Sequence, residues 1–264
     1  MKERIVTGVI AGIVFILLIV IGQLPFTIVI IGLASIGLFE LLKMKNIVSL
    51  SIMGALSLIF MWTIVIPNQW FETGFLSNFS RSDLLIGIII LFLAITVLTK
   101  NSITFDEVGF VILSSAYVGL GFHFLIETRL LENGLSLLFF ILFLIWSTDS
   151  GAYFAGRSFG KRKLWPEISP KKTIEGSLGG IFCALFIGLI YHYFVPISDS
   201  IGTVIIMILV VSIVGQIGDL VESALKRHYS VKDSGNILPG HGGILDRFDS
   251  LIFVLPVLYL LHFI

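Results

Sequence analysis

The chain has 264 residues, of which 56% are hydrophobic and only 13% are charged, with a mean hydropathy of +1.05. Soluble domains carry about 25% charged residues, so this composition excludes an ordinary globular protein. The 17 basic and 17 acidic residues balance and there is a single cysteine, so we expect no nucleic-acid partner, no intrachain disulfide and no multi-cysteine zinc site.

Apolar segments long enough to cross a bilayer recur along the chain. A transmembrane helix needs about 20 mostly apolar residues. The first segment has no clear small-x-small cleavage site, so we expect a retained span and not a signal peptide. We predict an all-α fold, a polytopic integral membrane helix bundle with about nine transmembrane helices. The predicted spans are roughly 5–22, 25–42, 47–66, 83–99, 105–126, 135–156, 174–195, 201–222 and 248–264.

The distribution of Lys and Arg between alternate loops predicts the orientation. With a cytoplasmic N-terminus, 15 basic residues lie inside and 2, Arg81 and Arg129, lie outside. This asymmetry favours nine spans, because one missed span would spoil the alternation after it. The inside set is Lys2, Arg4, Lys43, Lys45, Lys100, Arg157, Lys161, Arg162, Lys163, Lys171, Lys172, Lys226, Arg227, Lys232 and Arg247.

Charge is also uneven along the chain. Residues 1–130 have short loops and little charge within their spans, which predicts an N-terminal transmembrane scaffold. Residues 131–264 contain two longer loops predicted to be cytoplasmic, 157–173 and 223–247, and we interpret this half as the catalytic region.

Two pairs of small residues four positions apart indicate close helix packing. Gly8 and Gly12 form the first pair, and Gly176 and Gly180 form the second. Small residues let helix backbones approach one another in membranes. We therefore expect these glycines to serve packing and not chemistry.

Asp149 lies inside the predicted sixth span. At 1.5 Å rise per residue it would sit roughly 10 Å from the cytoplasmic end. A carboxylate at that depth needs a partner, a metal or water. Neighbouring hydroxyls favour a polar substrate-binding pocket, and the alternative is an ion pair that locks two helices.

The densest polar stretch runs from residue 218 to residue 250 and holds five acidic residues, four Lys or Arg and two His. Charge beside a bilayer usually marks function. Four polar residues near the end of the eighth span would share one helical face because they are spaced three and four apart. They are Asp219, Glu222, Ser223 and Lys226.

Asp246 and Asp249 lie three apart at the predicted start of the ninth span. In a helix their carboxylates would lie on one side, which suits a hard cation such as Mg²⁺. Capping of the helix N-terminus is the alternative. Two acids together with Asp219 exceed what a cap requires, which favours a metal or substrate site.

A glycine run, PGHGG, directly precedes these acids. Its Gly240, Gly242 and Gly243 would let backbone N–H groups approach an anion, and the following helix N-terminus would favour phosphate. His241 would donate to a phosphate oxygen or pair with a carboxylate. The run is flanked by Lys232 and Asp233 on one side and by the acids on the other, which strengthens an interpretation as a substrate-binding loop.

Lys171, Lys172 and Thr173 precede the predicted seventh span. They offer charge and a hydroxyl for a phosphate near the membrane surface. Ordinary positive-inside anchoring and a helix start are the alternatives.

These groups together predict a site for a nucleoside triphosphate with Mg²⁺, where metal ions bridge phosphate oxygens. Its level in the membrane suggests a lipid as second substrate. No Walker A, HRD or DFG motif occurs, which argues against a P-loop ATPase or a protein kinase. A carrier for a phosphorylated solute is the competing hypothesis, but its polar groups should continue across the midplane. A purely structural scaffold leaves the 218–250 charge unexplained.

Three segments carry a family resemblance. They are DSGAYFAGRSFGK from Asp149, SPKKTIEG from Ser169, and SALKRHYSVKDSGNILPGHGGILDRFD from Ser223 to Asp249. The last resembles the signature of phosphatidate cytidylyltransferases, also called CDP-diacylglycerol synthases. The resemblance implies that CTP and phosphatidate give CDP-diacylglycerol and pyrophosphate, by attack of the lipid phosphate on the α-phosphorus of CTP. It also implies phospholipid biosynthesis at the cell membrane.

The resemblance further implies roles for particular residues. Asp219, Asp246 and Asp249 would hold the metal ions, and they form the catalytic set together with Lys226 and Arg247. Charge on CTP or on the lipid would be neutralised by Lys226, Arg227, Lys232 and Arg247. The expected cofactor is Mg²⁺, with a monovalent cation such as K⁺ as an optional second ion, and the expected assembly is a homodimer.

Overall fold

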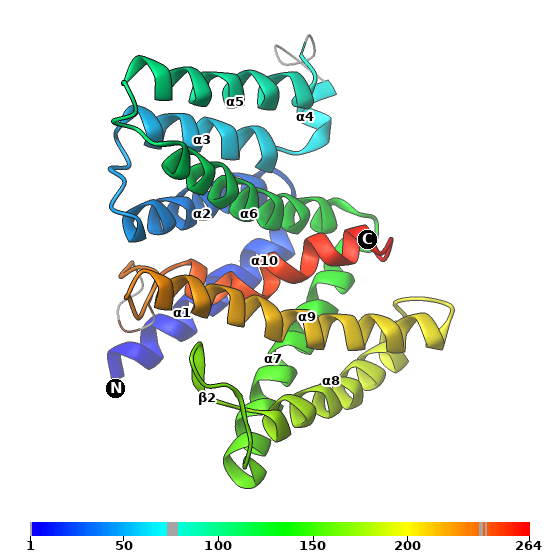
Figure 1. Ribbon diagram of the computed structural model, residues 1–264. Helices are drawn as coiled ribbons and strands as arrows, with labels where there is room; N and C mark the ends of the chain where they lie inside the picture. The colour runs from blue at the N-terminus through cyan, green and yellow to red at the C-terminus, as the bar shows by residue number, and fades with distance from the viewer. Residues whose placement is uncertain (1, 73–78, 238–239, 241) are drawn as a thin grey trace. The chain divides into compact units, whose positions relative to one another are not determined.

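The computed structural model describes residues 2–72, 79–237, 240 and 242–264, and this part of the chain is almost wholly helical (Figure 1). Two short strands, β1 (Lys163–Trp165) and β2 (Ser169–Thr173), are the described exception. The helices are α1 (Lys2–Ile21), α2 (Gln23–Met44), α3 (Ile52–Val65), α4 (Asn68–Glu72), α5 (Arg81–Leu98), α6 (Phe105–Leu130), α7 (Gly134–Phe159), α8 (Ile174–Phe194), α9 (Ile201–His228) and α10 (Leu245–Leu260).

Within the described ranges, a helix lies at each of the nine predicted span positions. Six of them, α2 and α5 to α9, are long and apolar enough to cross a membrane. By contrast, α3 has 14 residues and α10 has 16, which is short for a span. The chain is therefore a multi-pass membrane protein on length and composition, while the count of nine spans stays a prediction.

The predicted loop 157–173 contains regular structure that the sequence analysis did not anticipate. Helix α7 continues to Phe159, and β1 then pairs antiparallel with β2. The register places Lys163 opposite Thr173 and Trp165 opposite Ser169. The all-α fold class is therefore confirmed, and the hairpin is a short local departure within this loop. The second loop is also shorter than predicted, because α9 runs on to His228.

The chain divides into two compact units. Unit 1 comprises Met1–Glu127 with Asp233–Leu245, and unit 2 comprises Thr128–Lys232 with Asp246–Ile264. The segment that carries the glycine run thus belongs with the N-terminal helices, although it lies late in the sequence.

In unit 1, α3 lies between α2 and α5 (Figure 1). Its close packing depends on a small residue of α6: a Cβ at Gly119 would lie 3.0 Å from Ile64. The hydroxyl of Ser115 on α6 donates to the backbone oxygen of Ser57 at 3.1 Å, and both residues are fully buried. Apolar burial and a satisfied polar pair therefore hold these helices together.

In unit 2, α7 and α8 pack through glycines. A Cβ at Gly176 would lie 2.8 Å from the oxygen of Ala152, and one at Gly180 would lie 2.6 Å from the oxygen of Thr148. The packing predicted for this pair is confirmed. At Gly12 an added Cβ would meet nothing within 4 Å, so the close packing predicted there is not found within the described chain.

Candidate functional site

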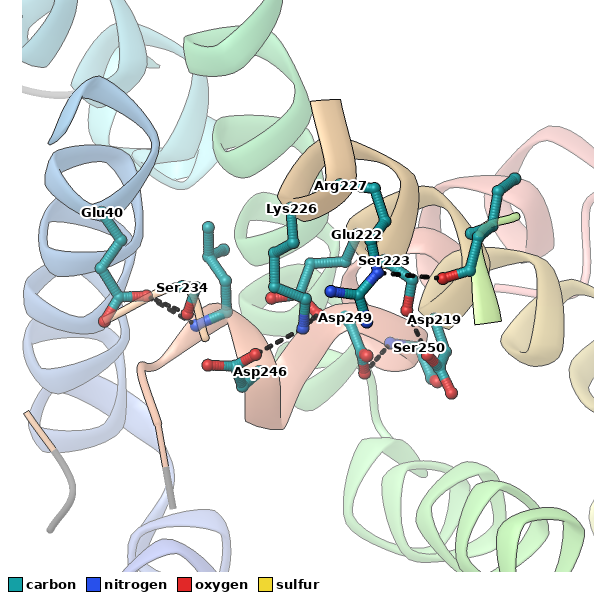
Figure 2. A network of polar contacts seen from close by, with 12 residues as sticks. Glu40, Asp219, Glu222, Ser223, Lys226, Arg227, Ser234, Asp246, Asp249 and Ser250 are labelled. Carbon is teal, nitrogen blue, oxygen red and sulfur yellow. Dashed lines mark hydrogen bonds and ion pairs between the residues drawn. The ribbon is translucent and has the colours of Figure 1, made fainter. Parts of the chain in front are cut away.

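The last turns of α9 carry a buried ion-pair network in unit 2. The ammonium of Lys226 lies 2.6 Å from Oε2 of Glu222 and 2.6 Å from Oδ1 of Asp246 (Figure 2). The exposed fractions of these side chains are 14% for Lys226, 1% for Glu222 and 6% for Asp246. A single cation thus serves two carboxylates that have almost no access to solvent.

The spacing along α9 explains half of this network. Glu222 precedes Lys226 by four residues, the arrangement that brings opposite charges together on one helix face. Desolvated carboxylates are strongly unfavourable without a partner, so Lys226 is needed structurally. The other oxygen of Glu222, Oε1, is buried with no hydrogen-bond partner in the described chain. This leaves one acceptor uncompensated in the network.

A second group of acids lies nearby in the same unit. Asp249 interacts electrostatically with both Asp219 and Asp149, and like charges at this range repel. Lys172 pairs with Asp219, with Nζ 2.6 Å from Oδ2. The hydroxyl of Ser223 donates to the other oxygen of Asp219 at 3.3 Å. Lys172 therefore partly offsets the charge of Asp219 and Asp149, and Lys226 acts in the same way on Asp249.

The hairpin of β1 and β2 carries Lys172 to this group. The carboxylate of Glu175 accepts from the backbone N–H groups of Lys161 and Arg162, which ties the entry of the hairpin to the first turn of α8. Arg227 of α9 donates from Nε to the carbonyl of Ile168 at 3.4 Å (Figure 2). The positions of Lys172 and Arg227 thus depend on a structure that the sequence analysis treated as an open loop.

Thr173 ends β2 and begins α8. Its buried hydroxyl accepts from the N–H of Gly176 at 3.1 Å, which makes it the N-cap of α8. Lys171, two residues before it, is exposed. The helix-start alternative therefore applies to Thr173, whereas Lys171 remains available for a ligand.

The glycine run lies in unit 1. Gly240 and Gly242 have φ of 76° and 80°, in the left-handed region that favours glycine. His241 lies outside the described residues, so its predicted role is not tested. Gly243 is buried, and a Cβ there would collide with the hydroxyl of Ser234 and with the carboxylate of Glu40. This glycine is thus required for packing whether or not it contacts a phosphate.

Three of the remaining predicted residues are exposed. Lys232 and Asp233 lie between α9 and the glycine run, and Arg247 lies in the first turn of α10. Their predicted roles in binding a charged ligand stay predictions.

Glu40 of α2 is a buried carboxylate that the sequence analysis missed. It is 6% exposed and accepts from the hydroxyl of Ser234 at 2.8 Å and from the N–H groups of Ile244 at 2.8 Å and Leu245 at 3.0 Å (Figure 2). The signal was present, because Glu40 lies inside the predicted span 25–42. The rule that singled out Asp149, that a carboxylate within a span needs partners, applies equally to Glu40.

The predicted metal carboxylates Asp219, Asp246 and Asp249 all lie in unit 2, and their role as metal ligands stays a prediction. Asp219 and Asp249 belong to the group with Asp149, whereas Asp246 is bound by Lys226. In the described part of the chain, no three His, Cys, Asp or Glu residues are already arranged to hold a metal ion. Glu222 shares the predicted helix face but was not chosen as a site residue, and it proves to be the most buried member of the network.

Comparisons with known proteins agree over the whole length. Residues 2–264 match the model of the Cytidylyltransferase family. The phosphatidate cytidylyltransferase of Bacillus subtilis (strain 168) is 52% identical over 264 residues, covering 99% of this chain and 97% of that protein. The phosphatidate cytidylyltransferase of Staphylococcus saprophyticus is 46% identical over 261 residues, and that of Staphylococcus aureus (strain COL) is 45% identical over 264 residues. Each covers 99% of this chain and 98% of the relative.

Proposed function

The chain belongs to the cytidylyltransferase family, and we propose that it converts CTP and phosphatidate to CDP-diacylglycerol and pyrophosphate in phospholipid biosynthesis. The observation that carries this proposal is the 52% identity to a phosphatidate cytidylyltransferase over 99% of the chain. This identity favours a nucleotidyltransferase over a solute carrier or a structural scaffold, because neither alternative explains the match to the family signature.

The reaction exchanges one phosphoanhydride bond for another. An oxygen of the phosphatidate phosphate forms a bond to the α-phosphorus of CTP, and the bond between the α-phosphorus and the bridging oxygen of the β-phosphate breaks. Pyrophosphate leaves with that electron pair. Because the lipid phosphate is already ionised, no general base is needed.

The chain supplies positive charge for these phosphates from several elements. Lys171 and Lys172 come from the hairpin, Arg227 from α9, and Arg247 from α10. Lys172 and Arg227 are held in place by Asp219 and by the carbonyl of Ile168, which supports a preorganised binding surface. We further assign Lys232 and Ser223 to substrate binding.

Lys226 has a different role in this proposal. Its ammonium is already bound by Glu222 and Asp246, so we assign it to orienting Asp246 and not to contacting a phosphate. The loop Asp233–Leu245, with its left-handed Gly240 and Gly242, is proposed to bind phosphate through its backbone.

The acids in unit 2 fit a hard divalent cation. Asp149, Asp219 and Asp249 repel one another, and oxygen ligands are those that Mg²⁺ prefers. Asp219 and Asp249 would hold Mg²⁺, and Asp246 would join them while Lys226 holds its Oδ1. Bound Mg²⁺ would supply stabilisation of charge on the transferring phosphoryl group. A monovalent ion such as K⁺ would share these carboxylates.

We propose nine spans with a cytoplasmic N-terminus and a site that faces the cytoplasm, where CTP is found. The asymmetry of 15 basic residues against 2 supports this orientation. We also propose a homodimer, which crosslinking in native membranes would test.

The activity is tested with purified protein, phosphatidate, labelled CTP and Mg²⁺. Labelled CDP-lipid and pyrophosphate should form in equal amounts, and chelation of the metal should stop both. Asp246→Asn and Asp249→Asn should abolish turnover while the protein stays folded in detergent. Asp106→Asn, an exposed acid in the first turn of α6, is the matched control. Absence of both products would refute the activity, and near-normal turnover in both variants would remove these acids from the metal site.

A further inference from the structure

Glu40 joins the two ends of the loop Asp233–Leu245. Its Oε2 accepts from the hydroxyl of Ser234 and from the N–H of Leu245, and its Oε1 accepts from the N–H of Ile244. Ser234 stands at the start of the loop, and Ile244 and Leu245 stand at its end. One carboxylate therefore closes a segment that contains the left-handed Gly240 and Gly242.

The loop is shaped around this carboxylate. A Cβ at either Gly235 or Gly243 would collide with the carboxylate of Glu40. Both glycines are thus needed for the loop to reach α2, one near each end. Five residues of the loop, Ser234, Gly235, Gly243, Ile244 and Leu245, surround one acidic side chain.

Apolar packing contributes little on one flank of the loop. A groove of about 520 Å³ separates part of it from the end of α2, with Lys43 and Asn46 on the helix side and Asn236 and Ile237 on the loop side. Ile237 is 51% exposed. On this flank the loop is held by hydrogen bonds to Glu40, whereas its C-terminal end is also held by burial of Ile244 and Leu245, which are 5% and 0% exposed.

Glu40 also serves the helix that follows. Leu245 is the first residue of α10, and the first N–H groups of a helix have no partner within it. A carboxylate at a helix N-terminus is additionally stabilised by the helix dipole. Glu40 thus accepts from the first N–H of this helix, from a position about 200 residues earlier in the sequence.

We propose that Glu40 is a positioning residue that fixes the two described ends of the loop, residues 234–235 and 243–245, and thereby places the loop backbone for the phosphates of CTP. The inference rests on the proposed function and extends it to a helix of the predicted scaffold. Glu40 touches no substrate in this proposal, because all of its described partners belong to the loop.

The test compares Glu40→Gln with Ser234→Ala and with a control, Lys43→Gln, at an exposed position three residues further along α2. Glutamine keeps the size of the side chain but replaces one acceptor with a donor, so one of the loop donors loses its partner. Hydrogen exchange in peptides covering Ile244 and Leu245 should become about 10- to 100-fold faster, as expected for loss of a charge-assisted hydrogen bond.

Steady-state kinetics supply the second readout. In Glu40→Gln the KM for CTP should rise at least about 10-fold, while kcat and the KM for phosphatidate change less than about 3-fold. Ser234→Ala should give a smaller effect in the same direction. In the double variant Glu40→Gln with Ser234→Ala, the KM for CTP should rise by less than the product of the two single-variant increases, because both substitutions act on one contact. The control should match the wild type.

Several results would overturn the inference. Unchanged exchange at Ile244 and Leu245 in Glu40→Gln would show that the carboxylate does not hold the loop. Faster exchange with unchanged kinetics, or an equal loss for both substrates, would reduce Glu40 to a purely structural residue. An inactive wild type would instead refute the proposed function and with it the link to CTP, while the exchange measurement would still decide whether Glu40 holds the loop.

Discussion

Replacing Lys226 with Met removes the only described cation bound between Glu222 and Asp246 and leaves a linear side chain of similar length. Both acceptors are at most 6% exposed, so neither can recover its solvation by turning to water. Removing one partner of a buried ion pair typically costs about 3–5 kcal/mol, because the remaining charge stays buried and unpaired. We expect Lys226→Met to lose that amount of unfolding free energy.

The loss of unfolding free energy in Lys226→Met should depend on Glu222. Adding Glu222→Gln to Lys226→Met removes one of the two unpaired charges, so at least about 1 kcal/mol should return. This recovery separates an electrostatic cause from a packing cause, because glutamine has the size of glutamate. Without an effect of charge, the second substitution would only add to the damage.

The assay is thermal unfolding in detergent followed by tryptophan fluorescence at one scan rate. At about 2–4 °C per kcal/mol, Lys226→Met should lower the apparent midpoint by about 6–20 °C. Lys161→Met, at an exposed position in the same unit, should shift it by less than about 2 °C. A shift below about 3 °C for Lys226→Met, or a double variant less stable than the single one, would refute the reasoning.

Three further predictions concern packing, capping and topology. Gly218→Ala places a Cβ 2.7 Å from Phe253 and 2.8 Å from the backbone oxygen of Asp249, so it should lower the free energy of unfolding by about 1–3 kcal/mol. An unchanged unfolding midpoint would show that α9 and α10 can move apart at this position without cost. Thr173→Ala should lower the free energy of unfolding by about 1 kcal/mol because the N-cap of α8 is lost. Thr173→Ser keeps the hydroxyl and should retain most of that stability, so equal losses in the two variants would contradict capping. A reporter fused after Ile264 should lie outside the cell, and a cytoplasmic reporter would break the nine-span model.

Local patterns predicted the helices because each depends on a run of apolar residues within one segment. The same holds for the pair of Glu222 and Lys226, whose four-residue spacing specifies a contact in any helix. The glycine packing of α7 on α8 was also predicted, since small residues four apart let membrane helices approach, although the same spacing ending at Gly12 meets no neighbour in the described chain. These are the features for which sequence distance and spatial distance agree.

The hairpin of β1 and β2 shows the limit of that reasoning. Its strands have three and five residues, and their composition resembles a basic loop. What stabilises the hairpin is tertiary: Glu175 binds its entry, Arg227 binds its turn region, and Lys172 pairs with Asp219. No window of the sequence contains all of these partners.

The three carboxylates predicted to share a metal show a second limit. A helical spacing of three puts Asp246 and Asp249 near one another, but it does not say which charges face them from other helices. Lys226 binds Asp246 directly and acts on Asp249 from a greater distance, while Asp219 and Asp149 also act on Asp249. Two acids on one helix therefore have different surroundings, and this difference arises from α7 and α9 and not from α10 itself.

The glycine run shows the same limit, because the contact of its loop with Glu40 cannot be read from the local sequence. Glycines before a helix are compatible with an anion-binding backbone, and the left-handed Gly240 and Gly242 keep that explanation open. Gly235 and Gly243 have a different cause, because a side chain at either would collide with Glu40. A glycine-rich segment can thus serve a ligand and a distant carboxylate at once. Substitution separates the two: Gly243→Ala should disturb the contact with Glu40 in the absence of CTP, whereas Gly240→Ala should act through its positive φ, at a residue that Glu40 does not bind.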